Sequence, residues 1–221
     1  MEVRYVSGAD AGSLLDPDGA AWRKARAESI KLIGTPLSLQ PTDAIRVAWS
    51  DKPIGAIDKV SVAALHDGER LAFRLEWDDS TENSELDDTT AFPDAAAVAL
   101  PAVEGTPLVT MGLEGAAVNA WYWRADEEKG GRHVVAEGLG TSRTLDAPIV
   151  GAKGLWRWAV VISRALRVTT EEPVIQLTPG QTTSFAVAVW EGSRGERAGI
   201  KAFSENWRKL VLQPLPTAGR S

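Results

Sequence analysis

The chain has 221 residues, of which 44% are hydrophobic and 24% charged, and its formal net charge is −6. This composition supports a globular core, and the negative charge argues against nucleic acid as a partner because phosphates select for Lys and Arg. The absence of cysteine excludes disulfides, thiolate-bound metal clusters and thioether-linked haem, and two histidines are too few for a three-His metal site.

The sequence contains no segment that resembles a membrane span or a leader. No apolar stretch approaches the roughly 20 residues that a helix needs to cross a bilayer. The first residues lack a basic region followed by an apolar one, so no signal peptide is expected.

Alternation of apolar and polar residues with period two dominates the chain, which is typical of strands with one buried face. Asp67-Gly68 lies between two such runs and predicts a hairpin turn. The expected strands, in chain order, are Ser29–Leu39, Ala44–Trp49, Lys59–Leu65, Arg70–Trp77, Ala95–Leu100, Leu108–Met111, Ala117–Arg124, Leu155–Ile162, Thr183–Trp190 and Trp207–Leu212.

Many strands joined by short loops, without regular strand–helix alternation, predict an all-β fold with minor helix. The expected architecture is a two-layer antiparallel β-sandwich. We expect a single domain over residues 1–221 with a frayed C-terminal tail at 214–221.

Met111 is the only methionine besides the initiator, and Gly112 follows it. A thioether is a soft ligand that suits haem iron, and the glycine would let a flat ring approach the backbone. The alternative is a core methionine that fills a gap, which is the commoner use of this residue.

Lys201 follows the glycine-rich stretch 192–199. A lysine binds a metal only as the neutral amine, so an iron-binding Lys201 must be desolvated or held by the metal. On composition alone, a solvated surface lysine is the simpler interpretation.

The chain contains nine tryptophans, and Asn119, Trp121 and Trp123 share one face of an expected strand. These three side chains either line a cofactor slot, stack on a sugar ring, or form part of the sandwich core.

Two further sets of residues have a chemical and a simpler interpretation. Seven carboxylates lie between Glu76 and Asp88, which indicates either a calcium site or, more simply, a solvated acidic loop. His66 and His133 are expected to be exposed polar residues, with His133 a reserve haem ligand.

An ordered series of segments gives the chain a resemblance to a known family. It resembles the haem b γ subunits of the ethylbenzene dehydrogenase, dimethyl sulfide dehydrogenase, and selenate and chlorate reductase group of molybdenum enzymes. The resemblance covers about residues 22–212, and the segments that carry it are Leu75–Asp79, Phe92–Val98, Met111-Gly112, Val118–Asp126, Phe185–Gly192 and Arg197–Lys201.

The resemblance implies a β-sandwich that binds one non-covalent haem b, with Met111 and Lys201 as the axial ligands of the iron. It also implies a heterotrimer with a molybdenum-cofactor α subunit and an iron–sulfur β subunit, and a periplasmic location. The chain would then pass single electrons between the β subunit and an external redox carrier such as a cytochrome c, without catalysing a reaction itself. Asn119, Trp121 and Trp123 are the expected lining of the haem pocket.

Two other functions are open from sequence. A tryptophan-rich sandwich also suits a carbohydrate-binding module, in which exposed aromatic side chains stack on sugar rings. A structural subunit that keeps the fold without haem is the third interpretation.

Overall fold

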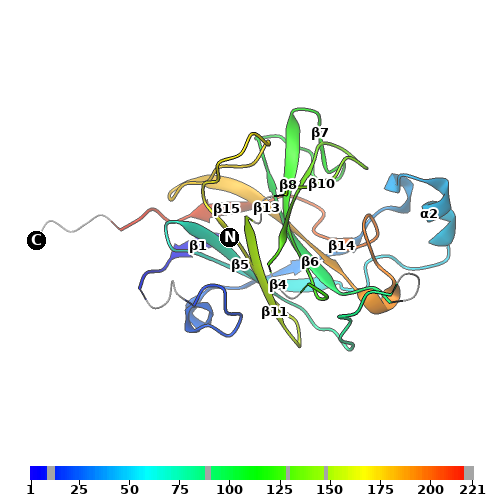
Figure 1. Ribbon diagram of the computed structural model, residues 1–221, viewed down its shortest axis with the longest axis horizontal. Helices are drawn as coiled ribbons and strands as arrows, with labels where there is room; N and C mark the ends of the chain where they lie inside the picture. Colours follow the sequence, from blue (N-terminus) through cyan, green and yellow to red (C-terminus); the bar gives the residue numbers. More distant parts are fainter. Residues whose placement is uncertain (9–12, 88–90, 128–129, 147–148, 217–221) are drawn as a thin grey trace, which may run out of the picture.

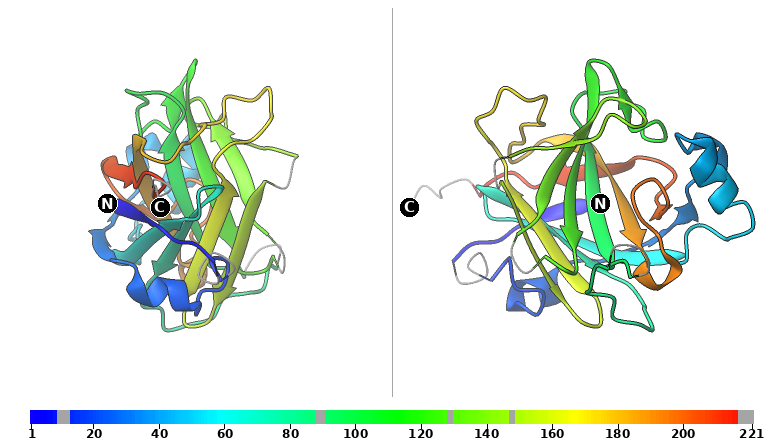
Figure 2. Two further views of the ribbon diagram at one scale, coloured as in Figure 1. Left: turned by 90° about the vertical axis from the view of Figure 1, so that its left-hand side faces the viewer. Right: turned by 45° about the vertical axis from the view of Figure 1, so that its right-hand side comes forward.

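The computed structural model describes residues 1–8, 13–87, 91–127, 130–146 and 149–216. Within these residues two β layers pack face to face and are joined through one continuous path of paired strands, as Figures 1 and 2 show. The predicted all-β fold with minor helix is confirmed. Most of the predicted frayed tail, residues 217–221, lies outside the described residues.

The first layer, called here the β5 layer, is a run of antiparallel strands. The predicted turn at Asp67-Gly68 joins two of them, and the Asp67 carboxylate accepts hydrogen bonds from the Glu69 and Arg70 N–H groups. In order across the layer, the strands are β2 (Glu28–Lys31), β4 (Lys59–His66), β5 (Arg70–Glu76), β12 (Ala159–Ala165) and β11 (Val150–Leu155).

The second layer, called here the β8 layer, is also antiparallel. Its main strands are β10 (Arg143–Thr144), β9 (Arg132–Ala136), β8 (Ala116–Arg124), β6 (Ala95–Pro101) and β13 (Thr182–Trp190). Three two-residue strands extend it: β14 (Ala202–Phe203) pairs with β13, β3 (Ile33–Gly34) with β14, and β7 (Gly112–Leu113) with β8.

The N-terminal strand joins the two layers. β1 (Glu2–Tyr5) runs parallel to β15 (Arg208–Leu212) and parallel to β4. β15 in turn pairs with the first half of β13. The path of strands is therefore mixed at this join, whereas the pairs within each layer are antiparallel as expected.

The core fills the space between the layers with large apolar side chains. Phe73 of β5 lies 5.6 Å from Phe185 of β13 and 6.0 Å from Trp121 of β8, measured between ring centroids. All three side chains are fully buried. Their contact across the layers fixes which face of each strand points inward.

Four expected strands are wrong in whole or part. Residues 44–49 belong to α2 (Asp43–Ala48), because the Thr42 hydroxyl caps the Ile45 N–H and favours a helix. Residues 108–111 form a turn. The run from 155 to 162 contains a break between β11 and β12, and the run from 29 to 39 divides into β2, β3 and a 3-10 turn, η2 (Leu37–Leu39).

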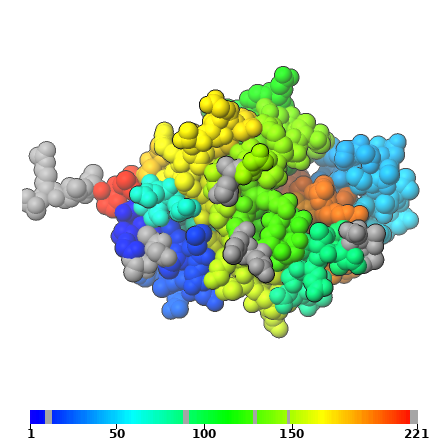
Figure 3. Space-filling model, in the orientation of Figure 1, coloured from blue at the N-terminus to red at the C-terminus, as the bar shows by residue number. Residues whose placement is uncertain are grey.

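The remaining helical elements are single 3-10 turns, η1 (Ala20–Lys24) and η3 (Gly192–Arg194). Among the described residues, no helix has the length and apolar character that crossing a membrane requires. Figures 1 and 3 show that the segment with η2 and α2 protrudes at one end of the molecule, beside the β8 layer.

Replacing Phe73 with Ala tests the contact between the layers. The substitution is expected to lower the free energy of unfolding by about 3–5 kcal/mol, because it leaves a cavity between two buried aromatic rings. Urea unfolding measures the change. The control is Val47→Ala on α2, where the side chain is 74% exposed and the expected change is within about 0.5 kcal/mol. Similar losses in the two variants would contradict this account of the core.

Candidate functional site

The main cavity lies on the outer face of the β8 layer, opposite the core. It has a volume of about 460 Å³. Its floor is made of small side chains from four neighbouring strands, namely Ala97, Ala99, Ala120, Ala136, Ala186 and Ala188.

Strand register sets these alanines in rows across the sheet. Ala99 of β6 pairs with Ala186 of β13 on one side and with Ala120 of β8 on the other, and Val134 of β9 continues the row. Three strand spacings give the row a width of about 14 Å. Because methyl groups stand barely above the backbone, the floor is flat and apolar and leaves room for a flat ligand.

Met111 reaches the cavity from the turn before β7. Its backbone has a φ of 57°, an unfavourable conformation for a residue other than glycine. Three hydrogen bonds hold the turn there: from the Met111 N–H to the Leu108 carbonyl, from the Gly112 N–H to the Pro107 carbonyl, and from the Gly138 N–H to the Met111 carbonyl. Such strain persists only where the surroundings enforce it, and it concentrates at functional sites.

Only glycine fits at position 112. Its φ is 88°, and an added Cβ would lie 2.6 Å from the Ala116 carbonyl oxygen and 2.8 Å from that of Ala136. The close approach of these backbones positions the Met111 turn against β8 and β9.

Lys201 enters the same cavity from the segment before β14. Thr35 holds its backbone from both sides: the Thr35 hydroxyl donates to the Lys201 carbonyl at 2.8 Å and accepts from the Lys201 N–H at 3.2 Å. The amine lies 5.5 Å from the centroid of the Trp190 ring. In the described part of the chain, no carboxylate forms an ion pair with it.

Burial lowers the pKa of Lys201 to about 8. At neutral pH the amine is therefore close to the point at which it loses its proton. A neutral amine offers a lone pair to a metal, so the environment of Lys201 suits ligation better than that of a solvated lysine.

The structure brings Met111 and Lys201 to one cavity, although they are far apart in the sequence. It does not bring Asn119, Trp121 or Trp123 there. These side chains lie on the inner face of β8 and are buried, while Ala120 and Tyr122 line the cavity between them. The expectation that the three residues line a cofactor pocket is wrong for this cavity, because they point to the core.

Asn119 has a structural role instead. Its amide accepts from the Ile175 N–H at 2.7 Å and donates to the Pro173 carbonyl at 2.9 Å, which ties the segment after β12 to the β8 layer. Trp121 and Trp123 belong to the main core cluster.

The two histidines are buried, contrary to expectation. His66 and His133 are 0% and 1% exposed, and burial lowers both pKa values, that of His133 to about 3. Neither lines the cavity, where Val134 takes the outward position beside His133. His133 therefore points away from the place where a reserve ligand would be needed.

Sequence reasoning missed the alanine floor and two arginines at the cavity, Arg132 and Arg143. The floor could have been predicted from the alanines at every second position, at 95, 97 and 99 and at 186 and 188. Arg143 is paired with Glu172 at 2.6 Å, and Arg132 with Glu127. Arg124 binds Asp126 with two hydrogen bonds and does not line the cavity.

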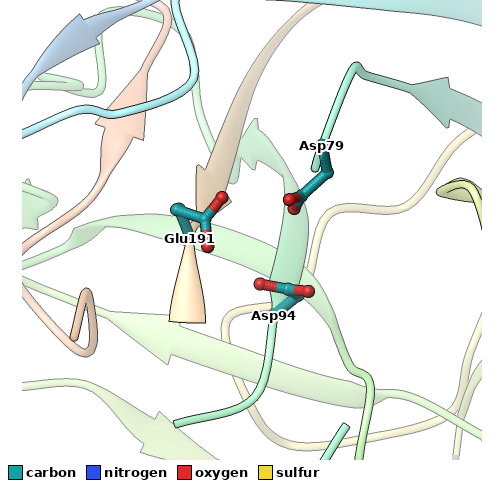
Figure 4. Close-up of side chains that lie close together, drawn as sticks. All are labelled: Asp79, Asp94 and Glu191. Carbon is teal, nitrogen blue, oxygen red and sulfur yellow. The ribbon is translucent and has the colours of Figure 1, made fainter. Parts of the chain in front are cut away.

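A separate cluster of carboxylates, none of which lines the cavity with the alanine floor, is shown in Figure 4. Oxygens of Asp79, Asp94 and Glu191 lie within 4.8 Å of one another. Asp94 is fully buried and accepts hydrogen bonds from the N–H groups of Asn83 and Gly192 and from the Trp158 indole. Asp79, near the start of the acidic stretch 76–88, is thus partly buried, whereas the other described carboxylates of the stretch are exposed, as expected for a solvated loop. Burial raises the pKa of Glu191 to about 7.

Comparisons with known proteins show the family to which the chain belongs. The family model described as ethylbenzene dehydrogenase matches residues 19–153. Chlorate reductase subunit gamma from Ideonella dechloratans is 36% identical over 217 residues, which cover 95% of this chain and 83% of that protein. The chain belongs to the ethylbenzene dehydrogenase family.

Two further relatives have related names. A putative respiratory nitrate reductase heme subunit from Haloferax mediterranei is 32% identical over 90% of this chain and 69% of that protein. Dimethylsulfide dehydrogenase subunit gamma from Rhodovulum sulfidophilum is 28% identical over 90% of this chain and 76% of that protein.

The fold is also found in a solved structure. A family 9 carbohydrate-binding module from Caldicellulosiruptor kristjanssonii, in complex with glucose, superposes with a TM-score of 0.52 over 100% of this chain and 99% of that one. The sequences are 12% identical, so the likeness shows the architecture alone.

Replacing Lys201 with Met tests whether the amine is desolvated. In ligand-free protein at pH 7, Lys201→Met is expected to be more stable than the wild type by about 1–3 kcal/mol, because a buried charge is removed. The folded wild type loses its proton near pH 8 and the unfolded chain only near 10.5, so wild-type stability rises between these values and the difference shrinks. Urea unfolding at pH 7 and 9.5 measures both.

The matched control is Lys59→Met on β4, where the side chain is exposed. This variant is expected to stay within about 0.5 kcal/mol of the wild type at both pH values. A pH-independent difference for Lys201→Met would show that its amine is solvated.

Proposed function

We propose that this chain is the haem b subunit of a multi-subunit molybdenum oxidoreductase, in which it transfers electrons and catalyses no reaction. Met111 and Lys201 would bind the iron from opposite sides. The observation that carries the proposal is that a thioether and a desolvated amine, from distant segments, line one cavity with a flat alanine floor. Relatives that are named gamma subunits and a heme subunit support it.

The residues of the cavity fit a haem on three counts. The apolar floor is about 14 Å across, which leaves room for a large flat ligand between Met111 and Lys201. Met111 is held by its backbone in a conformation that an ordinary gap-filling methionine does not need. Lys201 has a lowered pKa, so the free energy needed to present a neutral amine is smaller than for a solvated lysine.

A haem bound here would accept and release one electron at a time. The chain's residues would hold it, orient it and keep water away. A thioether ligand favours the reduced state and raises the potential. Met111 and Lys201 would both hold the iron, and an iron held by two protein ligands would supply electron transfer and not catalysis.

The same proposal extends to partners and location. Electrons would pass between an iron–sulfur β subunit, itself linked to a molybdenum-cofactor α subunit, and an external carrier such as a cytochrome c. The periplasmic location implied by the family resemblance stays a prediction. The acidic character of the chain, with a net charge of −6, suits a basic carrier protein.

The tryptophans do not favour the alternative of a carbohydrate-binding module. Sugar stacking needs aromatic faces that are open to solvent. Seven of the nine tryptophans are less than 9% exposed, and Trp156, at 38%, is the only exposed one. The tryptophans mainly build the core.

Visible spectra of protein made with haem available test the proposal. The wild type is expected to show a Soret band, with sharp α and β bands on reduction, as six-coordinate low-spin iron does. Met111→Ala is expected to lose low-spin character or to show a lower reduction potential, because the thioether is removed. Lys201→Ala is expected to lose low-spin character as well. The control is Val109→Ala, which alters an apolar cavity residue that has no donor atom.

A colourless wild type, despite a sufficient haem supply, would contradict haem binding. A Met111→Ala variant whose reduced spectrum and potential match the wild type would remove Met111 as a ligand. If Val109→Ala changed the spectrum as much as Met111→Ala, general damage to the cavity would explain both.

A further inference from the structure

Arg164 is an unusual residue for the core of a sandwich. It lies on β12 with its side chain fully buried, on the same inward face as Val160 and Ile162. Its guanidinium carbon lies 4.9 Å from the centroid of the Trp121 ring, across the gap between the layers. A charged side chain at this depth normally requires a partner of opposite charge.

The hydrogen bonds of Arg164 all go to neutral groups. Nε donates to the Ala165 carbonyl at 2.9 Å, and Nη2 donates to the carbonyls of Leu166 at 3.3 Å and Ile175 at 2.7 Å. Nη1 has no partner among the described residues. None of the carboxylates in the described ranges forms an ion pair with the guanidinium.

The charge of Arg164 is present and uncompensated. Burial lowers its pKa to about 10, which leaves the guanidinium protonated at neutral pH. His133, the titratable side chain that senses its charge, is kept neutral because burial and Arg164 lower its pKa to about 3. The carbonyls that Arg164 binds need only an N–H donor, which a neutral side chain also supplies, so the hydrogen bonds alone do not require a charge.

This charge lies directly behind the floor of the alanine cavity. Trp121 points inward to the guanidinium, while its neighbours Ala120 and Tyr122 point outward into the cavity. On β9, His133 likewise points inward, while its neighbour Val134 points outward into the cavity. One layer of apolar protein separates the charge from the cavity, and such a layer screens charges much less than water does.

We propose that Arg164 sets the reduction potential of the cofactor in the cavity, by holding a fixed positive charge behind the floor. The inference rests on the proposed haem function. Oxidised haem carries one more positive charge than reduced haem, so a nearby fixed cation disfavours the oxidised form. Arg164 would therefore raise the reduction potential of a haem held in the cavity. Arg164 touches neither haem nor its ligands and acts through its field alone.

Arg164→Gln and Arg164→Lys separate charge from hydrogen bonding. Gln is neutral and keeps an N–H donor for the carbonyls, whereas Lys keeps the charge. At the wild-type midpoint potential, the ratio of reduced to oxidised haem is expected to fall on the order of tenfold in Arg164→Gln. This is the effect of a unit charge about 10 Å away at an effective dielectric constant of about 20. Arg164→Lys is expected to stay near the wild-type ratio. Spectroelectrochemical titration of the haem-loaded proteins measures both.

Three results would overturn the proposal. One is an Arg164→Gln midpoint equal to the wild type, and another is an equal fall in Gln and Lys, which would indicate a structural role. A wild type with no Soret band would defeat the haem function and this inference together. A normal six-coordinate spectrum with an unmoved midpoint would defeat the inference alone.

Asn119→Asp serves if Arg164→Gln does not fold. Asn119 accepts from the Ile175 N–H, and Arg164 donates to the carbonyl of the same residue. A carboxylate at 119 would therefore lie beside the guanidinium, which keeps the acid ionised, and leave the bonds of Arg164 in place. The midpoint is expected to fall because the positive charge is compensated. An unchanged midpoint in this variant would overturn the proposal.

Discussion

The alternation of side chains along β8 is the constraint on which the cavity depends. Trp121 and Trp123 point inward and pack in the core, which holds the strand rigidly in place. Ala120 points outward between them and contributes to a flat floor. A shift of one residue in register would exchange the two faces and place indoles in the cavity and methyl groups in the core. The register of β8 therefore determines both the bulky inner face that packs in the core and the flat outer face that forms the cavity floor.

The rim of the cavity contains two features that cost free energy. Met111 occupies a backbone region that side chains disfavour, and Lys201 keeps an amine in poorly solvated surroundings. Neither feature is needed to build a sandwich, since a glycine and an apolar residue would serve better at these positions. Their occurrence in one cavity is explained if both act on the same ligand. The hydrogen bonds of Thr35 and Gly138 to these two residues show how the surrounding segments keep them there.

Alternation predicted most of the strands, and the family resemblance pointed to the two rim residues, but one set of side chains was misplaced. The pattern around 118–124 correctly groups Asn119, Trp121 and Trp123 on one face, but periodicity does not say which face is the core. The alanines opposite them were overlooked, because small residues give little contrast in an alternating pattern. Residues 44–49 show the alternation of a strand, yet they form a helix because Thr42 caps its N-terminus. Such local hydrogen bonds outweigh a short alternation.

A sandwich of this kind has two outer faces, and what lies on each face decides what it binds. The fold that this chain shares with a carbohydrate-binding module fixes the strands and leaves the outer residues free to differ. An aromatic face presents rings for a sugar to stack on, whereas an alanine face leaves an apolar cavity in which a large flat ring can come close to the backbone between Met111 and Lys201. Such a ring is also brought within reach of charges on the inner side of the layer. A buried cation such as Arg164 can then act on it through a single sheet, without an opening in the core and without contact.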